Sequence, residues 1–139
     1  MAQVRDGMST EVLFVRPDDS LHEVASRMRE RNVGSAIVDV PDRPAPGIIT
    51  ERDIVQALAD RSDAGDAKVG DHFTADVTTA GTDWSLEDAA RSMLKRGFRH
   101  LVVLDEDGQV RGVVSMRDVV RGIVGEGQEV EKVPSQPDE

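Results

Sequence analysis

The sequence predicts an α/β (α+β) fold in which two pseudo-symmetric β-α-β-β-α repeats pack through their sheets. The first observation behind this prediction is an internal repeat, because a shift of 65 residues places 17–58 on 82–123 without a gap. Twelve of these 42 pairs are identical, whereas chance would give roughly three at ordinary residue frequencies. The second observation is size: a unit of about 55 residues cannot bury both faces of a three-stranded sheet, but two facing units can.

Each repeat is expected to begin with a short strand, at 12–15 in the first copy and at 77–79 in the second. A helix follows each strand, because residues 20–23 (Ser-Leu-His-Glu) have the form of a capping box and residues 85–88 (Ser-Leu-Glu-Asp) have its Asp variant. Apolar residues then recur at helical spacing, which predicts one buried face for each helix. Gly97 is predicted to end the second of these helices.

Two further strands and a second helix complete each repeat. Short runs of β-branched residues bounded by turn residues are typical of strands. Such runs occupy 36–40, 47–50, 101–104 and 112–115, and the helices after them are predicted over 51–60 and 116–124.

The two strand-to-strand connections differ. Residues 105–108 (Asp-Glu-Asp-Gly) predict a hairpin turn, whereas the prolines within 41–46 favour an extended, stiff loop. Between the copies the chain becomes polar, and near its end it becomes rich in Gly, Glu and Pro. The predicted organisation is a first repeat at 3–60, a linker at 61–67, a second repeat at 68–124 and a flexible acidic tail at 125–139.

Composition argues against several classes of function. The net charge of −10 disfavours binding to nucleic acid or to an anionic membrane surface. The chain has no Cys, which excludes disulfides and thiolate chemistry. The N-terminus shows no secretion signal, and no apolar run is long enough to span a bilayer, so a cytoplasmic location is expected.

One motif occurs in both copies, where a strand is expected to pass into a helix. It reads Gly-x-x-Thr-x-x-Asp at 47–53 and Gly-x-x-Ser-x-x-Asp at 112–118. The hydroxyl and the carboxylate are good helix-capping groups, and capping alone would explain them. The same geometry suits a ligand, since free helix N–H groups favour a phosphate, a carboxylate can hold a ribose diol, and Gly admits a flat group. The motif is compatible with both interpretations.

The order and spacing of these motifs resemble those of the cystathionine-β-synthase-type (CBS) domain, twice over. Residues 19–28, 33–35 and 47–53 are similar to one such domain, and 84–93, 98–103 and 112–118 are similar to a second. The family commonly has Pro in the middle strand, where this chain has Ile37 and Val102, a departure that concerns strand shape more than ligand chemistry.

The resemblance implies a disc-like pair of CBS domains, called a Bateman module, whose clefts often bind AMP, ADP, ATP or other adenosyl compounds. In the family the Asp typically holds the ribose hydroxyls and the Thr or Ser lies near the phosphate. This nominates Thr50 and Asp53 for one site, and Ser115 and Asp118 for the other. The resemblance also places beside the ligand Val33, Gly34 and Ser35 in the first copy, and Phe98, Arg99 and His100 in the second.

The two copies differ in charge at these positions. Arg99 and His100 supply a cation where the first copy has Gly34 and Ser35. Because an Arg can hold a phosphate through two hydrogen bonds, we expect one occupied nucleotide site or two unequal ones.

The sequence therefore predicts a non-catalytic regulatory module that binds an adenosine-type nucleotide in an inter-repeat cleft and signals to a partner protein. The alternative is a ligand-free dimerisation or interaction module, whose junction residues only cap helices. No triad, metal-ligand spacing or phosphate loop is visible, so we expect no enzyme activity and no required cofactor; AMP, ADP, ATP and S-adenosylmethionine are the candidate ligands. Apolar helix faces beyond those that one pair can bury predict a homodimer.

Overall fold

Two three-stranded sheets form the centre of the molecule. The computed structural model describes residues 2–43, 46–60, 63, 65–75 and 77–127, and each sheet contains the strands of one repeat. In both sheets the first strand runs parallel to the middle strand, and the last strand runs antiparallel to it. The first sheet has the order β1 (Phe14–Val15), β2 (Ser35–Val38), β3 (Gly47–Thr50), and the second has the order β4 (Thr79–Gly81), β5 (His100–Leu104), β6 (Val110–Ser115).

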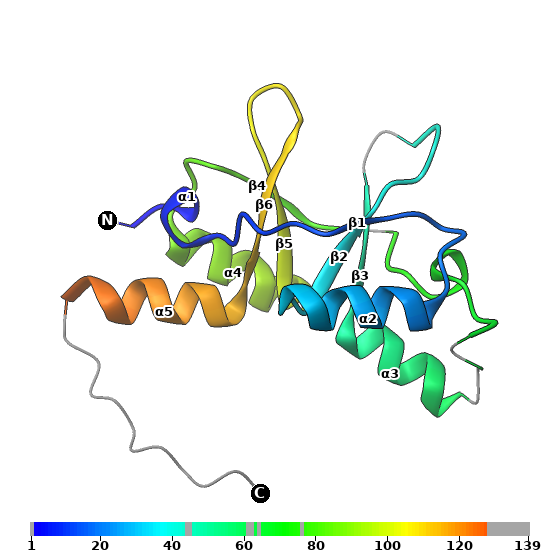
Figure 1. The fold of residues 1–139 in the computed structure, drawn as a ribbon. Coiled ribbons are helices and arrows are strands. Elements are labelled where there is room, and N and C mark those ends of the chain that lie inside the picture. The colour runs from blue at the N-terminus through cyan, green and yellow to red at the C-terminus, as the bar shows by residue number, and fades with distance from the viewer. Residues whose placement is uncertain (1, 44–45, 61–62, 64, 76, 128–139) are drawn as a thin grey trace, which may run out of the picture.

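Two longer helices accompany each sheet, and each pair packs an apolar face on the strands of its own repeat. Figure 1 shows α4 and α5 at one end of the molecule and α2 and α3 at the other, with the strands between them. The helices are α2 (Leu21–Arg31), α3 (Glu51–Ala59), α4 (Leu86–Arg96) and α5 (Met116–Gly127), together with the short α1 (Val4–Gly7) and the 3-10 helix η1 (Val69–Asp71).

The two sheets face each other through an apolar layer of their own. Ile37 of β2 and Ile48 of β3 pack with Val102 of β5 and Val113 of β6, and all four side chains are buried. Each sheet is thus covered by helices on one face and by the other sheet on its second face. The predicted fold of two repeats packed through their sheets is confirmed.

The segments that begin the two repeats are exchanged between them. We call residues 2–9 and 67–74 the lead-in segments. Val4 of the first lead-in segment is buried in the core of the second repeat, whereas Val69 of the second is buried in the core of the first repeat. Each repeat therefore completes its core with the lead-in segment of the other.

Backbone hydrogen bonds fix this exchange at equivalent positions. Ser9 exchanges two hydrogen bonds with Val113 of β6, at 2.9 and 3.1 Å. Thr74 exchanges two with Ile48 of β3, at 2.8 and 3.0 Å. In both contacts the two residues exchange a pair of N–H···O hydrogen bonds, as in an antiparallel ladder. Each lead-in segment therefore extends a sheet locally, beside β6 in one case and beside β3 in the other.

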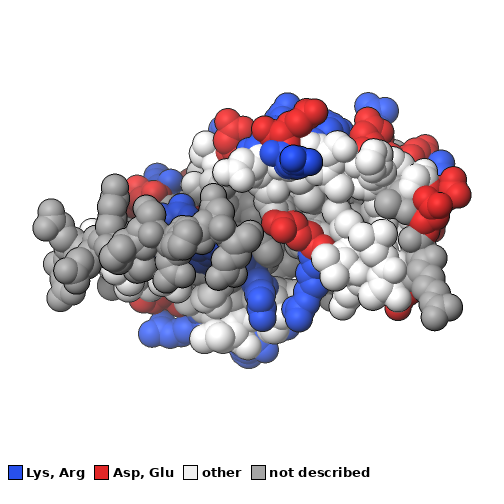
Figure 2. Space-filling model, turned by 60° about the horizontal axis from the view of Figure 1, so that its bottom comes forward, with Lys and Arg blue, Asp and Glu red and all other residues white. Residues whose placement is uncertain are grey.

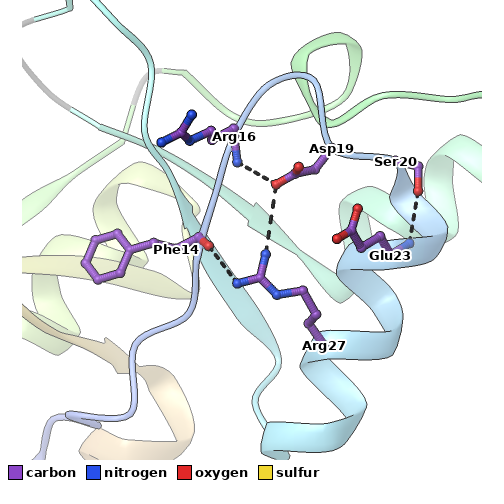
Figure 3. Close-up of polar contacts among 6 residues, drawn as sticks. All are labelled: Phe14, Arg16, Asp19, Ser20, Glu23 and Arg27. Carbon is purple, nitrogen blue, oxygen red and sulfur yellow. Dashed lines mark hydrogen bonds and ion pairs between the residues drawn. The ribbon is translucent and has the colours of Figure 1, made fainter.

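The predicted capping boxes of the first helix in each repeat form only in part. Ser20 accepts a hydrogen bond from the N–H of Glu23 at 3.1 Å (Figure 3), and Ser85 accepts one from Asp88 at 3.0 Å. Within the described part of the chain, neither acidic side chain returns a bond to the cap residue. The carboxylate of Asp88 pairs with Arg91 instead, at 3.1 Å.

A small polar cluster ties the start of α2 to the edge strand β1 (Figure 3). The carboxylate of Asp19 accepts a hydrogen bond from the N–H of Arg16 at 2.8 Å, and Arg27 donates to the carbonyl of Phe14 at 3.2 Å. The guanidinium of Arg27 thereby engages a carbonyl of an edge strand, a group that could otherwise pair with another chain.

Several boundaries differ from the prediction. The first strand of each repeat begins two residues late, at Phe14 and Thr79, where its registered pairing with the middle strand begins. The middle strands begin one residue early, at Ser35 and His100. Helix α5 continues to Gly127, because Gly125 keeps a negative φ and does not end it. Residues 125–127 of the predicted tail thus belong to α5, and the remainder of the tail lies outside the described residues.

The two connections also differ from each other in the structure. The hairpin over 105–108 is confirmed: Gly108 has a φ of 80°, and the carboxylate of Asp105 accepts hydrogen bonds from two backbone N–H groups of the turn. In the proline loop, Pro41 and Asp42 form a turn with Asp42 at a φ of 66°, so the predicted extended loop is wrong there. Residues 44–45 of that loop and 61, 62 and 64 of the predicted linker lie outside the described residues.

Thr78, just before β4, has a buried hydroxyl that no described residue hydrogen-bonds. The equivalent position in the first repeat is the buried Leu13. We expect Thr78→Val to raise the free energy of unfolding by about 1 kcal/mol in urea denaturation, because the shape is kept and an unpaired polar group is removed. Thr79→Val, on the neighbouring strand residue, is the control and should change it by less; equal gains in both variants would contradict the explanation.

None of the helices formed by the described residues has the length and apolarity needed to cross a membrane.

Candidate ligand cleft

A cleft of about 1290 Å³ lies where the two repeats meet. Its walls come from the starts of β2 and β5, the ends of β3 and β6, the first turns of α3 and α5, and residues of both lead-in segments. All ten binding residues predicted from the sequence line this one cleft. They are Val33, Gly34, Ser35, Thr50 and Asp53 from the first repeat, and Phe98, Arg99, His100, Ser115 and Asp118 from the second.

The junction of β3 and α3 forms a complete capping box. The carboxylate of Asp53 accepts hydrogen bonds from the N–H of Thr50 at 2.9 Å and from its hydroxyl at 3.2 Å, while the N–H of Asp53 donates to that hydroxyl at 3.3 Å. Both bonds to the carboxylate use Oδ2. The capping interpretation is therefore correct for this motif, and it leaves Oδ1 of Asp53 without a hydrogen bond to the described residues.

The junction of β6 and α5 repeats the same arrangement. The N–H of Ser115 donates to Oδ2 of Asp118 at 2.8 Å, and the N–H of Asp118 donates to the hydroxyl of Ser115 at 3.1 Å. Here the second carboxylate oxygen lies 3.8 Å from the guanidinium of Arg121, one turn further along α5. The equivalent of Arg121 in the first repeat is Gln56, so the two carboxylates have different neighbours.

The residues before the middle strands meet the helix starts through matched backbone contacts. The N–H of Glu51 donates to the carbonyl of Gly34 at 3.1 Å, and the N–H of Met116 donates to the carbonyl of Arg99 at 3.0 Å. These contacts hold the start of each middle strand against its capping box. Within each repeat, the predicted site residues before the middle strand are thereby held beside those of the Thr/Ser-x-x-Asp junction.

His100 lines the cleft. Burial lowers the pKa of its imidazole, while the carboxylates of Asp118, Asp53 and Glu51 act in the opposite direction and the nearby Arg99 acts in the same direction as burial. The carboxylates that act on His100 come from both repeats, in keeping with the single cleft that the two junctions line. Because the pKa is lowered, the imidazole is neutral at neutral pH, and Arg99 is the cation that this pair supplies.

The glycine of each motif has a different role from the one predicted. Gly47 and Gly112 are absent from the cleft walls formed by the described residues. A side chain at Gly112 would lie 2.5 Å from the backbone oxygen of Ser9, and one at Gly47 would meet the ring of Phe73. The missing side chains thus admit the lead-in segments rather than a flat ligand.

Several cleft residues were not predicted from the sequence. Met8, Ser9 and Thr74 enter the wall only because the lead-in segments are exchanged, and no local pattern signals that exchange. Glu51 lies within the motif itself and could have been found there, since it differs from its equivalent Met116 in charge.

The cleft differs in charge from the chain as a whole. Although the chain carries a net charge of −10, the cleft has more arginines than carboxylates among its lining residues. Figure 2 shows acidic and basic side chains close together in the middle of the molecule, between its two halves. The charged lining residues are Arg29, Arg52, Arg99, Arg117 and Arg121 with Glu11, Glu51, Asp53 and Asp118. Across the described residues, no group of three or more His, Asp or Glu side chains is placed to hold a metal ion.

Comparison with known proteins places this geometry in a family. The CBS domain matches the chain twice, over residues 2–60 and 69–125. The CBS domain-containing protein YhcV of Bacillus subtilis is 32% identical over 119 residues, which are 86% of this chain and 84% of that protein.

Solved structures share the fold. The CBS domain protein PAE2072 from Pyrobaculum aerophilum, complexed with AMP, has a TM-score of 0.73 and 27% identity, covering 84% of this chain and 88% of that one. The CBS domain pair of protein MJ0100, in complex with 5′-methylthioadenosine and S-adenosyl-L-methionine, has a TM-score of 0.75 and 26% identity, covering 86% and 98%. The chain therefore belongs to the CBS domain family, as a tandem pair of such domains.

Proposed function

We propose that this chain is a non-catalytic regulatory module that binds an adenosine-type nucleotide, AMP, ADP, ATP or a related compound, in the cleft between its repeats. The observation that carries the proposal is the meeting of both Thr/Ser-x-x-Asp junctions in one cleft. The AMP complex of a related CBS protein supports the class of ligand. S-adenosylmethionine is a further candidate, and no required cofactor is proposed.

The capping boxes support this proposal because they pre-position the binding groups. Asp53 is held by Thr50 through one oxygen, so its second oxygen can accept from a ribose hydroxyl without loss of the cap. The first turns of α3 and α5 line the same cleft, where the helix dipoles and the backbone N–H groups of Arg52 and Arg117 favour a phosphate. A capping role and a binding role are therefore compatible at the same residues.

Signalling to a partner protein requires that the ligand prefer one arrangement of the two repeats. The cleft walls come from both repeats and from both lead-in segments, so a bound nucleotide would contact parts of the molecule that belong to different halves. We propose that it biases their relative placement and that a partner protein reads this change. A cytoplasmic location is part of the same proposal.

Calorimetry and mass spectrometry test the binding. We expect the purified protein to retain an adenosine compound or to bind at least one of AMP, ADP, ATP, NAD or S-adenosylmethionine with measurable heat. The absence of heat and of any thermal shift with all five would rule out the sensor function.

Asp118→Ala is expected to weaken AMP binding about tenfold or more, since a hydrogen bond to a charged group is lost beside the cation Arg99. Asp53→Ala should weaken it less, because the first repeat has Gly34 where the second has Arg99. Titration of both variants by calorimetry measures the difference. Each variant also loses a cap worth about 1 kcal/mol, so the two serve as stability controls for each other. A larger loss in Asp53→Ala would refute the proposed asymmetry.

A ligand-free dimerisation module is the alternative, and one observation favours a dimer. Val55 and Leu58 on α3 and their equivalents Val120 and Ile123 on α5 are exposed to between 41% and 62%. Such a repeated apolar face is typical of a surface that pairs with a second copy. We propose a homodimer in either case; a dimer in sedimentation experiments with no nucleotide binding would favour this alternative.

A further inference from the structure

The two halves of the cleft differ in charge although their backbones match. Positions 34 and 51 of the first repeat correspond to 99 and 116 of the second, and each pair is joined by the same backbone hydrogen bond, at 3.1 and 3.0 Å. The side chains are Gly and Glu in the first repeat, but Arg and Met in the second. Gln56 also stands in place of Arg121, so these three positions make the second half more positive by three charges, and Arg29, whose equivalent is Leu94, offsets one of them in the first half.

The carboxylate of Glu51 is directed into the cleft. A side-chain carbon built on Gly34 would lie 2.5 Å from Oε1 of Glu51 and 3.5 Å from its carboxyl carbon. The carboxylate therefore lies over Gly34, in space that a side chain at this position would take. Glu51 is also the first residue of α3, so its charge occupies the positive end of the helix where a phosphate would be expected.

The second half offers the opposite environment. Arg99 takes the place of Gly34, and Met116 leaves the start of α5 without the charge that Glu51 carries in the first half. Arg121 lines the same half, whereas Arg117 has the identical equivalent Arg52 in the first half. A group with two negative charges is thus favoured at the start of α5 and repelled at the start of α3.

Resting on the proposed function, we infer that Glu51 makes the first half of the cleft select against a 5′-phosphate. The first half then takes an adenosine compound whose 5′ group is uncharged or cationic, and the second half takes the phosphorylated nucleotide. Glu51 acts as a specificity-determining residue. Gly34 contributes because it has no side chain, which leaves room for the carboxylate of Glu51.

AMP and 5′-methylthioadenosine are the probes, because they share the adenosine and differ in the charge of the 5′ group. We expect the wild-type chain to bind one AMP, and Glu51→Gln to bind two, with the affinity of the first half for AMP rising on the order of tenfold. The double variant Glu51→Gln with Asp53→Ala should return to one AMP. Binding of 5′-methylthioadenosine should be lost in Asp53→Ala and change less than about twofold in Glu51→Gln.

Glu87→Gln is the matched control. It removes one negative charge from the first turn of α4, which lies outside the cleft walls, and it should leave the AMP stoichiometry at one. If Glu51→Gln fails to fold, Glu51→Met, which copies the second repeat, replaces it.

The outcomes separate the two proposals. Two equal AMP sites in the wild-type chain, or equal effects of Glu51→Gln on both probes, would overturn the selectivity and leave the nucleotide-binding function standing. No AMP gain in either Glu51 variant would overturn it as well. If the wild-type chain binds neither probe, the proposed function fails, and the selectivity fails with it.

Discussion

Leu86→Ala is expected to lower the free energy of unfolding by about 2–5 kcal/mol, the largest effect of any single substitution considered for this chain. Leu86 is the first residue of α4 and is completely buried. Its side chain lies against Gly7 of α1 and fills the space left by the absent side chain of Gly122 on α5. Truncation would leave a cavity at the meeting point of three helices, where close packing leaves little freedom to collapse.

Leu94→Ala is the matched control for this prediction. It makes the same change on the same helix, but Leu94 is 75% exposed, so the free energy of unfolding should change by no more than about 0.5 kcal/mol. Denaturation in urea, followed by circular dichroism, measures both variants. Similar losses in the two would show that α4 does not pack on α1 and α5 as described.

Gly112→Ala is expected to destabilise the protein by about 1–3 kcal/mol, because the new methyl group would meet backbone rather than a side chain that can rotate away. The built carbon lies 2.5 Å from the carbonyl oxygen of Ser9 and 3.0 Å from the sulfur of Met8. Relief requires the first lead-in segment to move off β6, which would break its two hydrogen bonds with Val113. The substitution therefore tests the exchange of lead-in segments directly.

Gly125→Ala, by contrast, should raise the free energy of unfolding. Gly125 lies in α5 with nothing within 4 Å of a built side chain, and its φ is negative. Since Ala favours a helix over Gly, a gain of about 0.5–1 kcal/mol is expected. If Gly112→Ala leaves the stability unchanged in the same thermal unfolding series, residues 8 and 9 do not lie against β6.

The repeat in the sequence predicted much of this fold for a physical reason. Burial of both faces of a small sheet has few solutions, so two copies of one unit imply a shared core. Ile37 and Val102, equivalent by the repeat, meet in that core. The junction motifs were predicted equally well, because the capping contacts of Thr50 with Asp53 span three residues and depend on local geometry alone.

The features of the fold and the cleft that were not predicted depend on contacts between residues far apart in the sequence. Val4 and Val69 occupy equivalent positions in the repeat, yet nothing in either segment specifies which repeat it packs on. The gathering of both junctions into one cleft, and the position of the Glu51 carboxylate over Gly34, follow from that three-dimensional arrangement. Helix ends such as Gly127 were missed because glycine permits a helix as well as ending one.

The exchange of lead-in segments has a consequence for folding during translation. Residues 2–9 are made before the rest of the two repeats, but the strand they pair with ends at Ser115, more than 100 residues later. The first repeat, by contrast, can close as soon as residues 67–74 have emerged. The apolar Val4 and Met8 must therefore wait, unpaired, while the rest of the chain is translated, at a rate of about 5–20 residues per second. Residues 2–9 can therefore reach their native positions only after β6 has been made.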